Sequence, residues 1–180
     1  NFLKEGKKAG YIMTGSWSEK AFKETKFFGE AYHVASSKDD QYRYIPKISA
    51  NDFNEDDAYV HLTSNNTIFG TQWKEFPNTG QVPLIADMSS DIMSRTINIE
   101  QFDLIYAGAQ KNLGPSGVTV VIIRKSLLER ANDNIPTILS YETHVKNNSL
   151  YNTPPTFGIY MVGEVLKWIE MHGGIEAIAE

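Results

Sequence analysis

Two side chains in the sequence, an amine and a carboxylate, have settings that could support catalysis. Lys111 follows an apolar run and lies between Gly108-Ala109 and Gly114-Pro115, although lysines usually occupy solvated surfaces. An amine in such a turn can form a Schiff base with an aldehyde cofactor, and pyridoxal phosphate also needs an acid beside its pyridine nitrogen. Asp87 ends an earlier apolar run and is the candidate acid. The residues alone leave a second interpretation open, in which both lie in unrelated surface loops.

The runs that precede these two residues favour an α/β fold. Residues 82–86 and 102–107 are nearly continuous apolar segments, which is typical of parallel strands that are covered on both faces. Sheets of this kind bind ligands just beyond the carboxyl ends of their strands. Because Asp87 and Lys111 both follow such a strand, the sequence predicts that they share one edge of the sheet.

The rest of the chain supplies further strands and helices of the same domain. Ser16 and Glu19 have the spacing of a capping box, which predicts a helix from Ser16 to about residue 31. Short segments rich in Tyr, Val and Ile predict four more strands, at residues 32–36, 41–45, 59–62 and 117–123. Helices are predicted at residues 126–131 and from Thr156 to the Gly173-Gly174 pair.

Composition narrows the class of protein. The 180 residues are 41% hydrophobic and carry a net charge of −5, which excludes a disordered chain and argues against nucleic acid as a partner. No apolar run approaches the roughly 18–20 residues of a membrane span. The absence of cysteine excludes disulfides and thiolate zinc, and the four histidines lack ligand spacing, so no metal site is expected. Composition predicts a soluble, cytoplasmic α/β domain without a membrane partner.

Five segments together resemble the phosphoserine aminotransferase family, which belongs to the class V, fold-type-I pyridoxal phosphate enzymes. They are residues 15–18, 66–70, 86–90, 106–117 and 152–157, and the likeness extends over essentially the whole chain. The resemblance implies a three-layer αβα sandwich with a mostly parallel central sheet. It also implies that residues 1–180 are an incomplete large pyridoxal-phosphate-binding domain. The Gly- and Arg-containing phosphate loop and the C-terminal small domain would lie outside them.

The resemblance also assigns roles to individual residues. Lys111 would carry the Schiff base, and Asp87 would pair with the pyridinium nitrogen. Trp17 would stack on the cofactor ring, and Thr67 and Gln110 would form hydrogen bonds with the cofactor. Asn152 and Thr153 would reach the cofactor phosphate of the neighbouring subunit in a homodimer. From the residues alone, Trp17 would be a core side chain and the Asn152-Thr153 pair a helix cap.

The implied reaction transfers the amino group of L-glutamate to 3-phosphohydroxypyruvate. The products are O-phospho-L-serine and 2-oxoglutarate, in serine biosynthesis, and a second role in pyridoxine biosynthesis is a further option. Two alternatives stay open: another class V enzyme, such as an alanine–glyoxylate aminotransferase, and a catalytically inactive dimerisation domain.

Overall fold

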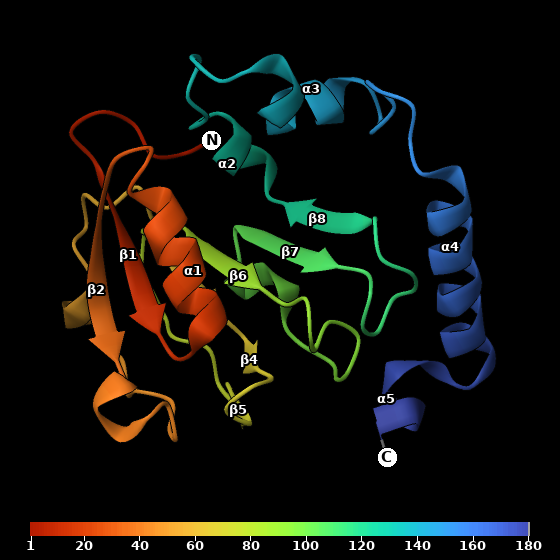
Figure 1. Ribbon diagram of the computed structural model, residues 1–180, viewed down its shortest axis with the longest axis horizontal. Helices are drawn as coiled ribbons and strands as arrows, with labels where there is room; N and C mark the ends of the chain where they lie inside the picture. Colours follow the sequence, from red (N-terminus) through yellow and green to blue (C-terminus); the bar gives the residue numbers. More distant parts are fainter. Residues whose placement is uncertain (180) are drawn as a thin grey trace.

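The computed structural model describes residues 1–179 (Figure 1). The strands are β1 (Lys8–Met13), β2 (Glu30–Ser36), β3 (Tyr59–Thr63), β4 (Asn65–Asn66), β5 (Thr71–Gln72), β6 (Leu84–Asp87), β7 (Leu104–Gly108) and β8 (Thr119–Ile123). The helices are α1 (Ser16–Thr25), α2 (Lys125–Leu128), α3 (Tyr141–Lys146), α4 (Thr156–Met171) and α5 (Gly174–Ala179). Four 3-10 turns complete the elements: η1 (Lys38–Asp40), η2 (Ala50–Asp52), η3 (Ile99–Gln101) and η4 (Thr137–Leu139). Within this part of the chain, no helix has the length and apolar character needed to cross a membrane.

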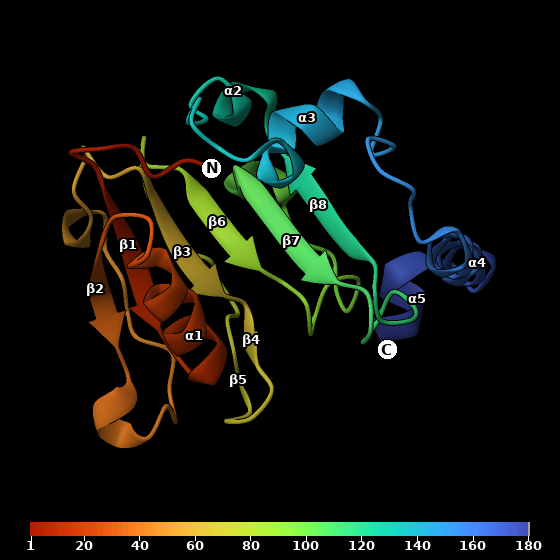
Figure 2. The same ribbon diagram turned by 45° about the horizontal axis from the view of Figure 1, so that its top comes forward.

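The centre of the molecule is a six-stranded sheet in the order β2-β1-β3-β6-β7-β8. Every neighbouring pair is parallel except β7 and β8, which are antiparallel. Figure 2 shows the parallel strands running side by side, so that their carboxyl ends meet at one edge of the sheet. This arrangement confirms the predicted α/β fold with a mostly parallel sheet. In this order β2 lies on one side of β1, and β3, the next strand along the chain, lies on the other side of β1. The direction of strand addition therefore reverses between β1 and β3, which makes this boundary a topological switch point.

The two faces of the sheet are buried in different ways. Tyr11, His61 and Tyr106 lie on the face that α1 covers, as the alternation of side chains along the paired strands requires (Figure 1). The opposite face holds the largest apolar cluster, which long loops cover together with Val162 of α4. Its fully buried strand residues are Ile12, Val60, Leu62, Leu84, Ala86 and Ala107. Burial on both faces explains why these strands are nearly continuous apolar runs.

One central strand and one irregular segment differ from the sequence interpretation. No strand is predicted before Ser16, yet β1 pairs with both β2 and β3. The strand predicted at residues 41–45 is wrong, because Gln41 and Tyr42 have φ values of 52° and 60° and therefore turn the chain. The Tyr42 ring is buried, and its hydroxyl group donates a hydrogen bond to Glu19 at 2.6 Å.

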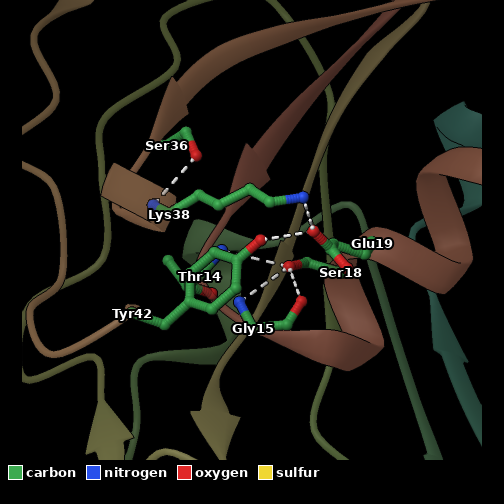
Figure 3. A network of polar contacts seen from close by, with 7 residues as sticks. All are labelled: Thr14, Gly15, Ser18, Glu19, Ser36, Lys38 and Tyr42. Atoms are coloured by element: carbon green, nitrogen blue, oxygen red, sulfur yellow. Dashed lines mark hydrogen bonds and ion pairs between the residues drawn. The ribbon is translucent and has the colours of Figure 1, made fainter. Parts of the chain in front are cut away.

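Helix α1 begins at Ser16 as predicted, but a different residue caps it. Ser18 Oγ accepts hydrogen bonds from the backbone nitrogens of Thr14 at 3.0 Å and Gly15 at 3.1 Å (Figure 3). The Ser18 hydroxyl group donates in turn to the Gly15 carbonyl at 2.7 Å. Glu19 therefore does not close a capping box. Its carboxylate instead binds Lys38 Nζ at 2.6 Å, which ties α1 to the segment after β2.

Candidate functional site

Most of the predicted site residues lie along the carboxyl edge of the parallel strands. Trp17 is in the first turn of α1, directly after β1, and Thr67 follows the short strand β4 after β3. Asp87 is the last residue of β6, and Lys111 lies just beyond the end of β7. Because these strands are parallel neighbours, one edge of the sheet carries all four side chains. This placement agrees with the edge that the sequence predicts.

A tight turn after β7 presents Lys111. The backbone carbonyl of Ala109 accepts hydrogen bonds from the nitrogens of Leu113 at 3.1 Å and Gly114 at 2.8 Å. Ala109 and Leu113 are buried, whereas Lys111 is exposed between them. The Lys111 amine reaches back to Thr67 and donates to its hydroxyl group at 3.4 Å. The turn thus brings together two predicted site residues that are 44 positions apart in the sequence.

The side chain of Gln110 lies over the last residue of β7. A Cβ atom added at Gly108 would lie 2.5 Å from Gln110 Oε1. Any residue larger than glycine at position 108 would therefore displace the Gln110 amide. The backbone nitrogen of Gly108 donates to Ser89 Oγ at 3.1 Å. Gly108 therefore serves two contacts at this edge: it leaves room for Gln110 and it joins β7 to the loop after β6.

Asp87 is held through one of its two carboxylate oxygens. Oδ1 accepts hydrogen bonds from the backbone nitrogen of Ser89 at 3.0 Å and from the Ser89 hydroxyl group at 2.6 Å. These are the two hydrogen bonds that the carboxylate accepts from residues 1–179, which leaves Oδ2 available. Sequence reasoning gave Ser89 no role. An aspartate followed two residues later by serine is, however, the pattern of an Asx turn, which would have indicated it.

A buried amide fixes the loops at the switch point. Asn66 is 2% exposed, and its Oδ1 accepts a hydrogen bond from Thr14 Oγ1 at 3.0 Å. Its Nδ2 donates to Thr71 Oγ1 at 3.1 Å. The segment that leads into Trp17 is thereby attached to the segment that carries Thr67. Trp17 itself is 43% exposed, so its indole is not the core side chain that the residues alone suggested.

Asn152 and Thr153 lie apart from these residues. They belong to the exposed segment between α3 and α4, beyond the edge strand β8 (Figure 2). Asn152 Nδ2 donates a hydrogen bond to the carbonyl of its neighbour Thr153 at 3.3 Å. No hydrogen bond or ion pair within residues 1–179 joins this pair to Lys111 or Asp87, so their assigned role stays a prediction.

The sequence indicated no role for His61, a histidine on the face of the sheet that α1 covers. His61 is buried on β3, stacks on the Tyr11 ring with centroids 4.8 Å apart, and lies with Nε2 2.9 Å from the hydroxyl oxygen of Tyr106. Burial lowers the pKa of His61 to about 4, and the negative charge of Asp87 opposes that shift. Burial also raises the pKa of Tyr106, with Asp87 adding to the effect. Both groups are therefore neutral near pH 7.

Comparison with known proteins places the chain in a family. The family model described as aminotransferase class V matches residues 1–180. Curated phosphoserine aminotransferases from Lysinibacillus sphaericus and Bacillus subtilis are 68% and 60% identical, over 99% and 100% of this chain. The chain spans about half the length of these relatives, 49% and 50% respectively.

Solved structures give the same result. The structure of the phosphoserine aminotransferase from Bacillus circulans subsp. alkalophilus has a TM-score of 0.95 at 59% identity, covering 99% of this chain and 50% of its own. That of a PLP-bound phosphoserine aminotransferase from Trichomonas vaginalis has a TM-score of 0.89 at 40% identity, covering 99% of this chain and 51% of its own. These findings confirm the resemblance drawn from the five sequence segments. The chain belongs to the class V aminotransferase family.

Proposed function

We propose that these residues form the cofactor site of a pyridoxal-phosphate-dependent phosphoserine aminotransferase. The observation that carries the proposal is that an amine, Lys111, and a carboxylate, Asp87, lie at the same edge of the sheet. The residues fit the cofactor in three respects. Asp87 Oδ2 is available for a ring nitrogen, the exposed Trp17 indole offers a stacking surface, and Thr67 lies beside the amine.

Each residue has a distinct task in this proposal. Pyridoxal phosphate, when bound, supplies a ring that accepts the electrons left when a substrate Cα–H bond breaks. Lys111 Nζ would hold the cofactor at its aldehyde carbon and, once displaced by the incoming amino acid, would take the proton from the substrate Cα. Asp87 would keep a proton on the ring nitrogen. Trp17 would stack on the ring, a contact of about 0.5–1.5 kcal/mol for aromatic pairs.

Thr67 and Gln110 would orient the cofactor from either side of the lysine. The Thr67 hydroxyl group is within 3.4 Å of Lys111 Nζ, so it can hold the amine in place before and after it is displaced. Gln110 precedes Lys111 in the same turn, and its amide is directed back over Gly108. Both side chains can donate hydrogen bonds to an oxygen on the cofactor ring.

The substrates in this proposal are L-glutamate and 3-phosphohydroxypyruvate, which give 2-oxoglutarate and O-phospho-L-serine in serine biosynthesis. Identities of 58–68% to phosphoserine aminotransferases across the whole chain support this pair. We also propose that the same enzyme has a second role, in pyridoxine biosynthesis. The alanine–glyoxylate aminotransferase from Nostoc shares the fold, with a TM-score of 0.69 at 13% identity.

Further proposals concern the whole protein. Residues 1–180 would be most of the large cofactor-binding domain, with the phosphate loop and the small domain supplied by the rest of a longer chain, in keeping with relatives of twice this length. The enzyme would be a cytoplasmic homodimer. Asn152 and Thr153, exposed and remote from Lys111 within one chain, would bind the cofactor phosphate of the neighbouring subunit.

The decisive experiment uses the full-length protein loaded with pyridoxal phosphate. L-glutamate is expected to shift the visible absorbance of the bound cofactor into the near ultraviolet, and 3-phosphohydroxypyruvate to restore it. Lys111→Ala should abolish turnover and borohydride trapping of the cofactor, whereas Lys146→Ala, at an exposed helix position, should change neither. Normal turnover in Lys111→Ala would refute the assignment. A preference for glyoxylate would indicate the alanine–glyoxylate activity, and absence of any adduct would indicate an inactive dimerisation domain.

Subunit mixing tests the dimer. Lys111→Ala and Asn152→Ala homodimers should each be impaired. A mixed dimer should regain one intact site, because the subunit that keeps Lys111 would be completed by the Asn152 of the other. No gain of activity on mixing would contradict the shared site.

A further inference from the structure

The cavity on the α1 face of the sheet contains a hydrogen-bonded pair that the proposed reaction does not use. The cavity measures about 210 Å³, and Tyr11, Tyr59, His61, Tyr106 and Tyr141 are among its lining residues. His61 Nδ1 is buried and has no hydrogen-bond partner among the described residues, although its Nε2 contacts the Tyr106 hydroxyl group. A buried polar atom without a partner has a free-energy cost of about 1–3 kcal/mol. A histidine kept at that cost calls for an explanation.

The strand register places this pair beside Asp87. Asp87 is the direct neighbour of Tyr106 across β6 and β7 and of Thr63 across β3 and β6, and His61 precedes Thr63 by two residues. Side chains two apart on a strand share a face, so Asp87, His61 and Tyr106 all lie on the α1 face. On the same face, Ile85 lies beside His61 across β3 and β6, and Leu104 lies beside Ile85 across β6 and β7.

We propose that His61 and Tyr106 are positioning residues for Asp87: a neutral, dipolar pair that gives its carboxylate a polar setting opposite the ring nitrogen of the cofactor. The inference rests on the proposed function. A histidinium here would compete with the ring nitrogen for the same carboxylate. An apolar side chain here would leave Asp87 in surroundings that disfavour its charge. A neutral imidazole bound to a phenol avoids both outcomes.

Among the described residues that line the cavity, no side chain is a carboxylate or a cation that could take over this effect. Burial keeps the imidazole neutral near pH 7, with a pKa of about 4. Besides His61, the ionisable side chains that line the cavity are phenols: Tyr11 from β1, Tyr59 from β3, Tyr106 from β7 and Tyr141 from α3. Asn1 also lines it, and burial lowers the pKa of its α-amino group. Asp87 is thus the one fixed negative charge that acts on this pair among residues 1–179.

The test measures the ring nitrogen itself. Full-length enzyme is loaded with pyridoxal phosphate labelled with 15N in the ring, and the nitrogen chemical shift reports its protonation. His61→Phe and Tyr106→Phe are expected to move the signal toward its position in Asp87→Asn, and His61→Gln should restore part of the wild-type shift. Tyr59→Phe removes a hydroxyl group from the same cavity, where it contacts Tyr11 at 3.2 Å, and should leave the signal in place.

Two results would decide between the possibilities. Wild-type signals in both His61→Phe and Tyr106→Phe would overturn the proposal. A wild-type signal in Asp87→Asn would instead overturn the cofactor assignment of Asp87, and with it the proposed function.

A second measurement needs no substitution at His61 and no cofactor. In the full-length apoenzyme, the 15N signals of the His61 ring should be those of a neutral imidazole from pH 5 to 8 and should shift in Asp87→Asn, because coupling between two groups is reciprocal. If the His61 signals do not respond to Asp87→Asn, the proposal is wrong even if the cavity variants fail to fold.

Discussion

The hydrogen bonds of Asn66 make a quantitative prediction, because this one side chain joins the two loops at the switch point. Thr14 Oγ1 donates to Oδ1 at 3.0 Å, and Nδ2 donates to Thr71 Oγ1 at 3.1 Å. Replacing Asn66 with alanine removes both bonds, each worth about 0.5–1.5 kcal/mol net. It also leaves the hydroxyl group of Thr14, which is fully buried, without its acceptor, at about 1–3 kcal/mol.

The expected loss in the free energy of unfolding of Asn66→Ala is therefore about 2–6 kcal/mol. The affinity for pyridoxal phosphate should fall as well, since Asn66 adjoins Thr67 and holds the segment before Trp17 in place. The assay is urea unfolding of the full-length apoprotein, followed by tryptophan fluorescence and by circular dichroism, whose coincidence establishes a two-state transition.

Two comparisons make this prediction specific. Asn147→Ala is the same substitution at an exposed position directly after α3. The hydrogen bond that this amide donates within residues 1–179 goes to the Thr143 carbonyl, and its loss should cost no more than about 0.5 kcal/mol. Thr14→Val removes the hydroxyl group that Asn66 binds. In combination with Asn66→Ala, it should recover about 1 kcal/mol, because no donor is then left unpaired. Equal losses in Asn66→Ala and Asn147→Ala, or strictly additive effects in the double variant, would refute the reasoning.

Three further predictions concern charge and space. The hydrogen bond from Lys38 lowers the pKa of Glu19 below its ordinary value of 4.5, so Glu19→Gln should cost about 0.5–1 kcal/mol at pH 7. The stability difference between the wild type and Glu19→Gln should shrink as the pH falls from 4.5 through the lowered pKa of Glu19, and a difference that stays constant at low pH would contradict this prediction. Burial lowers the pKa of His61 from 6.5 to about 4, so the wild-type protein should lose stability, by at most about 3 kcal/mol, as the pH falls from 6.5 to 4. His61→Gln should lack this loss in a series of unfolding curves, and an unchanged pH slope would count against it. Gly108→Ala should leave the melting temperature nearly unchanged but weaken cofactor binding as much as Gln110→Ala, because its Cβ displaces the Gln110 amide. Additive losses of affinity in the double variant would disprove that link.

The sequence alone predicted the strands next to the site. The apolar runs before Asp87 and Lys111 identify β6 and β7, because a strand buried on both faces needs apolar side chains at almost every position. The rule that parallel strands end at one edge then places both residues together. Helix α4 was also predictable, since Thr156 follows two prolines and Gly173 follows the last turn.

Features that depend on distant partners were not predictable. Strand β1 contains Gly10 and begins with the charged Lys8, and its character as a strand comes from pairing with β2 and β3 on either side. Residues 41–45 have strand-like side chains, but the chain turns at Gln41 and Tyr42, where the hydroxyl group of Tyr42 binds Glu19. In both cases a long-range contact outweighs the local preference.

The sequence by itself thus determined the fold class and the order in which Thr67, Asp87 and Lys111 follow their strands, because periodicity and strand ends are local properties. The tertiary structure decided that the amine of Lys111 contacts Thr67, that Asn66 joins the two switch-point loops, and that His61 and Tyr106 pair beneath Asp87. These contacts span 44, 52 and 45 residues, and only the pairing of parallel strands across the sheet brings such positions together.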